Sequence, residues 1–147
     1  MPRNAAAYDE DFFAWTQEQA RLLREGEFSK IDATNLAEEI EDMGKSNRRE
    51  LGSRFAVLLM HLLKWRFQPN RRSTSWEATI GEQRDEIEEL LRDSPSLQPQ
   101  VRDTLATVYK RARKKAIAET GLADSAFPAE CPFTPEQILD EGFLPQE

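Results

Sequence analysis

The sequence predicts an all-α protein, a single-domain antiparallel helix bundle of four long helices with two shorter ones. Apolar residues recur at intervals of three and four along most of the chain, and no stretch shows the sustained alternation of a strand. Glycine, proline and capping residues divide this pattern into separate segments. Short connections between long helices favour antiparallel neighbours, and 147 residues suit one helical domain, 1–147, with its own core.

The first long helix is predicted over about 9–25. Phe12 and Trp15 lie on one apolar stripe of this segment, and Gly26 is a suitable residue to end it. The preceding residues, 1–7, are expected to form a flexible N-terminus.

A shorter helix is predicted over 33–43. Leu36, Ile40 and Met43 follow one another at spacings of four and three, so they share one face and are expected to point inward. Gly44 is expected to end or kink this helix. The sequence leaves open whether it forms one kinked helix with the segment that follows.

The second long helix is predicted over 46–67 and contains the most apolar run of the chain, 55–63. Gln68 and Pro69 close it, because the residue before a proline avoids helical geometry. Its predicted core residues lie on one stripe: they are Leu51, Phe55, Leu58, Leu62 and Trp65.

Two further long helices are predicted over 74–94 and 98–120, the first of them opening with the capping box Thr74-Ser-Trp-Glu77. A second capping box predicts a short helix near 135–141. The rest of 122–147 is rich in proline and small residues, so we expect a mostly irregular segment that packs on the bundle.

Charge is segregated along the chain. Residues 45–72 contain eight Lys and Arg against the single acid Glu50, although the whole chain has a net charge of −7. Acidic and basic segments alternate, so successive helices are electrostatically complementary. We expect neighbouring helices to form ion pairs across their rims, each contributing a few tenths of a kcal/mol.

Composition limits the location and the partners. The N-terminus has no apolar signal-peptide core, and the nine-residue run 55–63 is less than half of a membrane span. The single cysteine, Cys131, fits a reducing compartment, so we expect a cytoplasmic protein without a membrane segment. The pI near 4.9 opposes binding of the whole chain to nucleic acid, but the basic segment 45–72 leaves local binding open.

No catalytic residue, metal ligand or cofactor motif is predicted. Cys131 follows Glu130, whose carboxylate raises a thiol pKa and so disfavours a nucleophile. No phosphate-binding or dinucleotide-binding glycine pattern occurs. His61 is the only histidine, and Leu58 stands where a Glu-x-x-His metal motif needs glutamate.

A polar interruption in the apolar stripe of 74–94 gives one candidate site. Gln83 lies on that stripe and Arg84 lies beside it, so each needs a buried partner or a ligand. The first interpretation is a hydrogen bond to a neighbouring helix, with His61 as a structural residue at the edge of the core. The second is a small polar pocket lined by Glu39, His61, Trp65, Trp76, Gln83 and Arg84.

The link between the second and third long helices gives another candidate. Arginines near a helix N-terminus can hold a phosphate or carboxylate, and aromatic residues there can stack on bases. The candidate contacts for an anion are Arg66, Arg71, Arg72, Ser73 and Thr74. The alternative is that Ser73 and Thr74 cap the helix while the arginines meet acids of other helices.

Motifs along the chain resemble a bacterial family catalogued as domain of unknown function 29. They include Asn35–Gly44, Leu58–Trp65, Ser73–Ile80, Glu119–Leu122 and Phe127–Pro132. The likeness spans about Tyr8–Pro145. It implies a small, mostly helical domain, and it supplies no activity, cofactor or catalytic residue.

These observations favour a cytoplasmic protein-interaction or oligomerisation module without catalysis, which binds a protein partner or forms a homo-oligomer. One alternative is a small-anion or acid–base site around His61, Gln83 and Arg84. The second alternative is nucleic-acid binding through the 45–72 surface.

Overall fold

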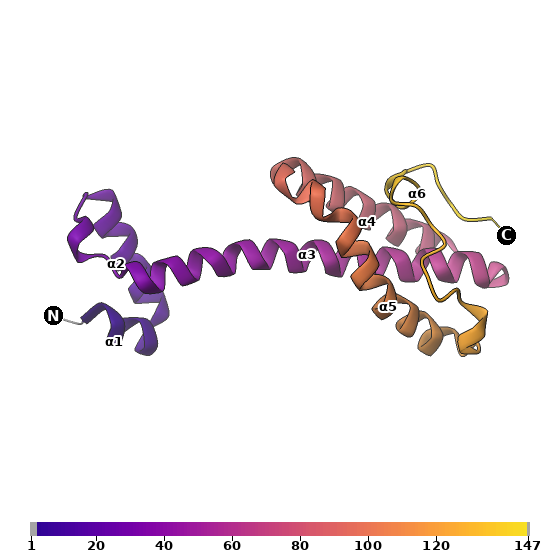
Figure 1. The fold of residues 1–147 in the computed structure, drawn as a ribbon, viewed down its shortest axis with the longest axis horizontal. Coiled ribbons are helices and arrows are strands. Elements are labelled where there is room, and N and C mark those ends of the chain that lie inside the picture. Colours follow the sequence, from indigo (N-terminus) through magenta and orange to yellow (C-terminus); the bar gives the residue numbers. More distant parts are fainter. Residues whose placement is uncertain (1–2, 147) are drawn as a thin grey trace. The chain divides into compact units, whose positions relative to one another are not determined.

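The structure is a computed structural model that describes residues 3–146, with side chains described from residue 7 onward (Figure 1). The α-helices are α1 Arg3–Glu10, α2 Phe12–Arg24, α3 Ala33–Phe67, α4 Thr74–Asp93, α5 Val101–Thr120 and α6 Pro135–Leu139. Short 3-10 helices are η1 Phe28–Lys30, η2 Pro69–Arg71, η3 Pro95–Gln100 and η4 Asp124–Ala126. The described residues contain no strand, so the predicted all-α helical fold is confirmed.

The chain forms two compact units, which are treated separately below. The N-terminal unit is Met1–Ser46 and the C-terminal unit is Asn47–Glu147. Helix α3 contributes its first residues to the former and its remaining residues to the latter. The expectation of one domain over 1–147 stays a prediction.

One question that the sequence left open is answered, and one helix boundary was predicted incorrectly. The segments 33–43 and 46–67 form one helix, because Gly44 keeps a helical φ and its neighbours are good helix formers that outweigh a cost of about 1 kcal/mol. The predicted helix 9–25 is divided at Asp11, whose carboxylate accepts a hydrogen bond from the Ala14 amide at 3.1 Å and caps α2. Of the segment 1–7, residues 3–7 lie in α1, and residues 1–2 lie outside the described part.

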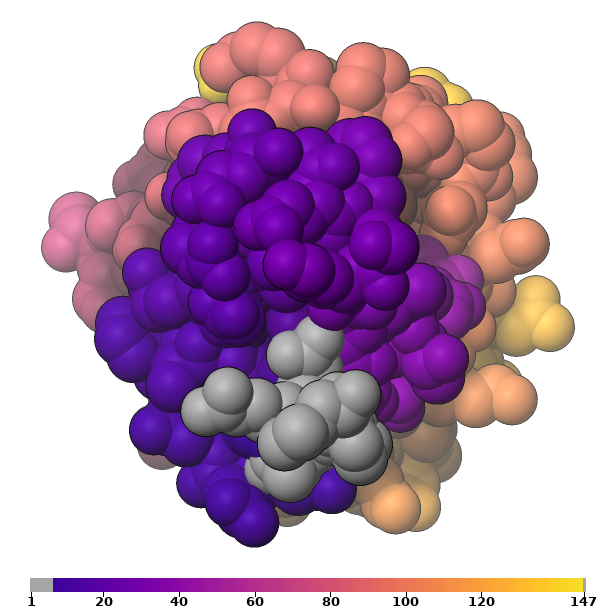
Figure 2. Space-filling model, turned by 90° about the vertical axis from the view of Figure 1, so that its left-hand side faces the viewer, coloured from indigo at the N-terminus to yellow at the C-terminus, as the bar shows by residue number. Residues whose placement is uncertain are grey.

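The N-terminal unit is built around a buried polar centre. Trp15 and Gln19 of α2 are each 1% exposed. The Trp15 indole donates to Asp32 Oδ2 at 3.1 Å, and the Asp32 amide donates to Gln19 Oε1 at 2.7 Å. Asp32 also accepts from the Asn35 side chain in the first turn of α3 at 2.8 Å. One carboxylate therefore connects α2 to the start of α3. The residues of this unit from 7 onward appear in indigo and purple in Figure 2.

The C-terminal unit holds the apolar core. Helix α4 runs back beside the second part of α3, where Arg54 pairs with Glu86 and Lys64 lies over Trp76, and α5 crosses α3 (Figure 1). The predicted core residues Leu51, Phe55, Leu58 and Leu62 are at most 1% exposed, and Trp65 is partly buried against them. Further α3 side chains are buried because neighbours cover more than one side of the helix. These are Leu59, Leu63, Ala56 and Met60.

Side chains of α4 and α5 fix the C-terminal segment through its main chain. Arg84 donates from Nε to the Ile138 carbonyl at 2.8 Å, and the Tyr109 hydroxyl donates to the Pro128 carbonyl at 2.7 Å. Phe127 of this segment is 2% exposed. The short helix α6 begins with the predicted capping box. The segment is therefore part of the packed unit, although its backbone is largely irregular.

Candidate functional site

The polar residues of the first candidate pocket each contact a different part of the protein. Gln83 Oε1 accepts from Arg54 Nη1 at 3.3 Å, which is the predicted hydrogen bond to a neighbouring helix. His61 Nδ1 lies 2.9 Å from the Val57 carbonyl oxygen of its own helix, and burial lowers the histidine pKa below its ordinary 6.5. These contacts do not bring the two side chains into one site.

Arg84 is 3% exposed and bonds to main-chain carbonyls of the C-terminal segment, at 2.8 Å from Ile138 and 3.3 Å from Gln137. Burial lowers its pKa, while the nearby acids Asp140 and Glu141 raise it. The guanidinium therefore binds the main chain of the C-terminal segment.

The remaining candidate pocket residues, Trp76, Trp65 and Glu39, are not brought together either. Trp76 lies under Lys64, whose Nζ is 4.7 Å from the centre of its ring. Trp65 lies under the guanidinium of Arg72 at 5.3 Å, and its buried indole nitrogen has no partner among the described residues. Glu39 belongs to the N-terminal unit, where it accepts a hydrogen bond from Tyr8 that raises the tyrosine pKa to about 12.

The predicted anion-contact residues mostly support the chain around η2. Ser73 caps α4 by accepting from the Trp76 amide at 3.2 Å, and Thr74 is the first residue of that helix. Arg72 donates from Nε to the Trp65 carbonyl at 2.7 Å, while Arg66 lies 5.2 Å from the ring of Phe67. Arg71 is exposed. Capping by Ser73 is as expected, but the predicted capping box from Thr74 to Glu77 is wrong, because Thr74 lies inside the helix. Arg72 contacts carbonyls where acids were expected.

Ion pairs between helices are fewer than the alternating charges suggested. Among the described residues of the C-terminal unit, Arg54 pairs with Glu86 of α4 at 3.6 Å, and Lys64 pairs with Glu119 of α5 at 3.0 Å. Four other basic residues of α3 form no ion pair with a described residue. Lys45, Arg48 and Arg49 are exposed, and Arg66 is partly buried. Much of the positive charge thus faces solvent.

Residues for metal or thiol chemistry do not assemble in the described part of the chain. It contains no group of three or more His, Cys, Asp or Glu side chains that could hold a metal ion. Burial raises the pKa of the half-buried Cys131 thiol, which makes it a poorer nucleophile at neutral pH. No helix of residues 3–146 has the length and hydropathy needed to cross a membrane.

The sequence analysis missed an exposed apolar surface on α2. Among the described residues, the exposed large apolar side chains all belong to the N-terminal unit: Phe12, Phe13, Leu23, Phe28, Ile40 and Met43. Phe13 is 72% exposed and Leu23 is 43% exposed. Single apolar residues are ordinary on a protein surface, so the question is which of these residues share one face.

Helical geometry places several of these residues on one face. At about 100° per residue, Phe12, Phe13, Thr16, Ala20 and Leu23 cover an arc of about 100° beside the buried stripe of α2. No charged residue lies within that arc. The Thr16 hydroxyl donates to the Phe13 carbonyl at 2.7 Å, so it needs no outside partner. We call these five residues the α2 apolar face.

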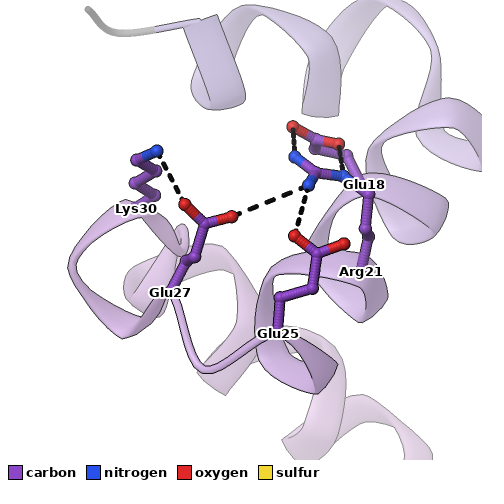
Figure 3. A network of polar contacts seen from close by, with 5 residues as sticks. All are labelled: Glu18, Arg21, Glu25, Glu27 and Lys30. Atoms are coloured by element: carbon purple, nitrogen blue, oxygen red, sulfur yellow. Dashed lines mark hydrogen bonds and ion pairs between the residues drawn. The ribbon is translucent and has the colours of Figure 1, made fainter.

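The opposite side of α2 carries a network of ion pairs (Figure 3). Arg21 bonds to Glu18 at 3.0 Å and to Glu25 at 2.9 Å, and it lies 3.6 Å from Glu27. Lys30 pairs with Glu27 at 2.8 Å, which lowers the pKa of the Glu27 carboxyl. The charges of this network are therefore paired within the unit, in contrast to the α2 apolar face.

The family model described as "Domain of unknown function DUF29" matches residues 7–144, nearly the whole length of the chain. The chain belongs to this family. Comparison with curated proteins and with solved structures finds no match. The resemblance noted from the sequence motifs is thereby confirmed.

Membership of DUF29 covers both units, including α2 and the core of the C-terminal unit. The description of the DUF29 model names no activity, ligand or partner. The function of this chain therefore has to be argued from its surfaces. A sequence signal for the α2 apolar face existed, because Phe12 and Phe13 are adjacent and cannot both point into one core stripe.

Proposed function

We propose that this DUF29 protein is a cytoplasmic protein-interaction module without catalysis, and that the α2 apolar face docks onto a partner protein. The observation that carries the proposal is the exposure of Phe13 at 72% beside the half-exposed Phe12 and Leu23 on one charge-free helical face. Burying a side chain of this size contributes about 1.5–3 kcal/mol, so three of them can anchor a specific contact.

The net charge of the N-terminal unit favours one kind of partner. Residues 9–42 hold eleven acids and three bases, and two of the bases, Arg21 and Lys30, already pair with nearby glutamates. A symmetric contact between two copies of the N-terminal unit would bring like charges together. A partner with an apolar patch rimmed by Lys or Arg is complementary to both features.

Paired affinity captures from the source cells test this proposal. The wild-type chain, Phe13→Ser and Met43→Ser are compared, because both variants remove one exposed apolar side chain of the N-terminal unit and only the first is in the α2 apolar face. We expect one partner to be retained by the wild type and Met43→Ser and lost by Phe13→Ser. The identified partner should then bind Phe13→Ser at least about ten-fold more weakly in isolation.

Equal binding of the partner to Phe13→Ser and to the wild type would contradict the proposal. Thermal unfolding of all three proteins provides the control for folding. Since both side chains are mostly exposed, their melting temperatures should agree closely.

A second candidate function is nucleic-acid binding through the basic 45–72 surface, supported by the exposed and unpaired Arg48 and Arg49. The affinity of such binding falls steeply as the salt concentration rises, because binding is driven by the release of cations from the DNA phosphates. The test is a gel-shift titration with double-stranded DNA at low and physiological salt. The proposal of nucleic-acid binding is supported if the wild-type chain retards DNA at low salt and the Arg48→Gln and Arg49→Gln variants do not. It is contradicted if the wild-type chain causes no retardation at low salt.

A further inference from the structure

The C-terminal unit has a surface pocket that none of the features above explains. It lies between α3 and α5, has a volume of about 250 Å³, and is lined by Ser53, Ala56, Val57, Met60, Arg111 and Lys115. Its place follows from how the two helices pack. They come close at Gly52, where an added Cβ would lie 3.5 Å from the Val108 side chain, and the pocket opens in the next turns of both helices.

The floor of the pocket is apolar. Ala56 is 7% exposed and Met60 is 8% exposed, and Val57 between them is half-buried. Ser53 adds a hydroxyl at the edge. Small-molecule sites commonly combine an apolar lining with a few polar groups that fix orientation. The volume lies below the usual range for drug-sized ligands, so only a small molecule fits.

The rim of the pocket is cationic. Arg111 and Lys115 lie four residues apart on α5, both are exposed, and neither forms an ion pair or hydrogen bond with a described residue. Arg113 of the same helix differs, because it bonds to main-chain carbonyls of the C-terminal segment. Two free cations beside an apolar floor complement a ligand that has a negative head and a short apolar chain.

We propose that this pocket binds a small amphiphilic carboxylate. The carboxylate accepts hydrogen bonds from Arg111 and Lys115, and a short alkyl chain covers Ala56 and Met60. Inorganic phosphate can bind the two cations of the rim but leaves the apolar floor exposed to water. A neutral alkyl compound covers the floor but leaves the two cations without an anionic partner. The proposal does not depend on the α2 apolar face, which belongs to the other unit.

Hexanoate is a suitable probe, with acetate and hexanamide as matched compounds that lack the chain and the charge respectively. Each is titrated into the full ¹⁵N-labelled chain, and amide shifts are followed by NMR. We expect saturable hexanoate shifts at the lining residues with a dissociation constant on the order of 1 mM, which suits so few ligand atoms. Acetate and hexanamide should bind at least about five-fold more weakly than hexanoate. Acetate lacks the alkyl chain that covers the floor, and hexanamide lacks the charge that pairs with the rim.

Three variants locate the site. Lys115→Gln removes a rim charge and Ser53→Leu fills the pocket without changing charge, so both should weaken hexanoate binding about five-fold or more. Lys110→Gln removes the same charge from α5 outside the lining, and it should leave binding unchanged. Absence of saturable shifts with hexanoate, equal binding of hexanamide, or an equal loss in Lys110→Gln would each overturn the proposal.

Discussion

The two units of this protein distribute polar and apolar residues in opposite ways. The N-terminal unit buries a polar centre around Asp32 and leaves large apolar side chains such as Phe13 in solvent. The C-terminal unit buries an almost wholly apolar core, in which Phe55 and Leu58 are fully buried, and leaves much of its positive charge exposed. This difference leads us to expect that the core of the C-terminal unit supplies most of the stability, and it is the basis for proposing the N-terminal unit as the binding surface.

The largest effect is expected when one phenylalanine of each unit is replaced by alanine, the buried Phe55 and the exposed Phe13. Phe55→Ala should lower the free energy of unfolding by about 3–5 kcal/mol, because it leaves a cavity in the core. Phe13→Ala should change it by no more than about 0.5 kcal/mol, because the ring is already exposed. Urea denaturation followed by circular dichroism measures both. A comparable loss in the two variants would show that the α2 apolar face contributes to the fold.

Replacement of Arg84 tests how the C-terminal segment is held. Arg84→Met keeps an apolar stem but removes the donors to the Ile138 and Gln137 carbonyls. We expect a loss of about 2–3 kcal/mol in the free energy of unfolding, because buried acceptors lose charged donors. The matched variant Arg92→Met removes only an exposed pair with Glu88 and should cost less than about 0.5 kcal/mol. Equal effects of the two substitutions would argue against this role.

A smaller and more local effect is expected at Asp32. Asp32→Ala removes the acceptor for Trp15 and for the first turn of α3, so it should destabilise the N-terminal unit by about 1–2 kcal/mol. Amide hydrogen exchange should quicken in α2 and stay unchanged in α4. Asp85→Ala, which removes an exposed carboxylate of α4, serves as the control. Faster exchange throughout α4 in Asp32→Ala would contradict the local role.

The smallest effect concerns His61 and pH. Burial lowers its pKa in the folded state below the ordinary 6.5, so the unfolded chain takes up a proton more readily. Stability present above pH 6.5 should therefore decline as the pH falls through the lower folded pKa, by less than about 1 kcal/mol in total. The difference in unfolding free energy between wild type and His61→Gln, measured at several pH values from about 5 to 7.5, isolates this contribution. A difference that does not vary with pH would exclude it.

Local patterns were sufficient to predict the fold class and much of the core. The stripe Leu51, Phe55, Leu58 and Leu62 was predicted from spacing alone and is buried, because four apolar residues on one face over about three turns fix the orientation of the helix. The continuity of α3 through Gly44 was not predictable, since a helix-weakening residue is tolerated when its neighbours favour the helix.

Spacing was insufficient wherever the outcome depended on what packs against a helix. Ile40 and Met43 share a face and were expected to point inward, yet they are 64% and 68% exposed. Of the site residues, Gln83 was correctly expected to need a partner, but that partner is Arg54, which lies 29 residues away in the sequence. Pairing at such a distance depends on the packing order of the helices, which the sequence pattern does not determine.

The way the C-terminal segment is fastened has a consequence for evolution. Tyr109, Arg113 and Arg84 all donate to main-chain oxygens, which every amino acid carries. Exposed positions of the segment such as Glu130 and Glu136 are therefore free to drift in identity, provided that the backbone keeps its course. Natural selection should act on the three donors and leave those positions variable among relatives.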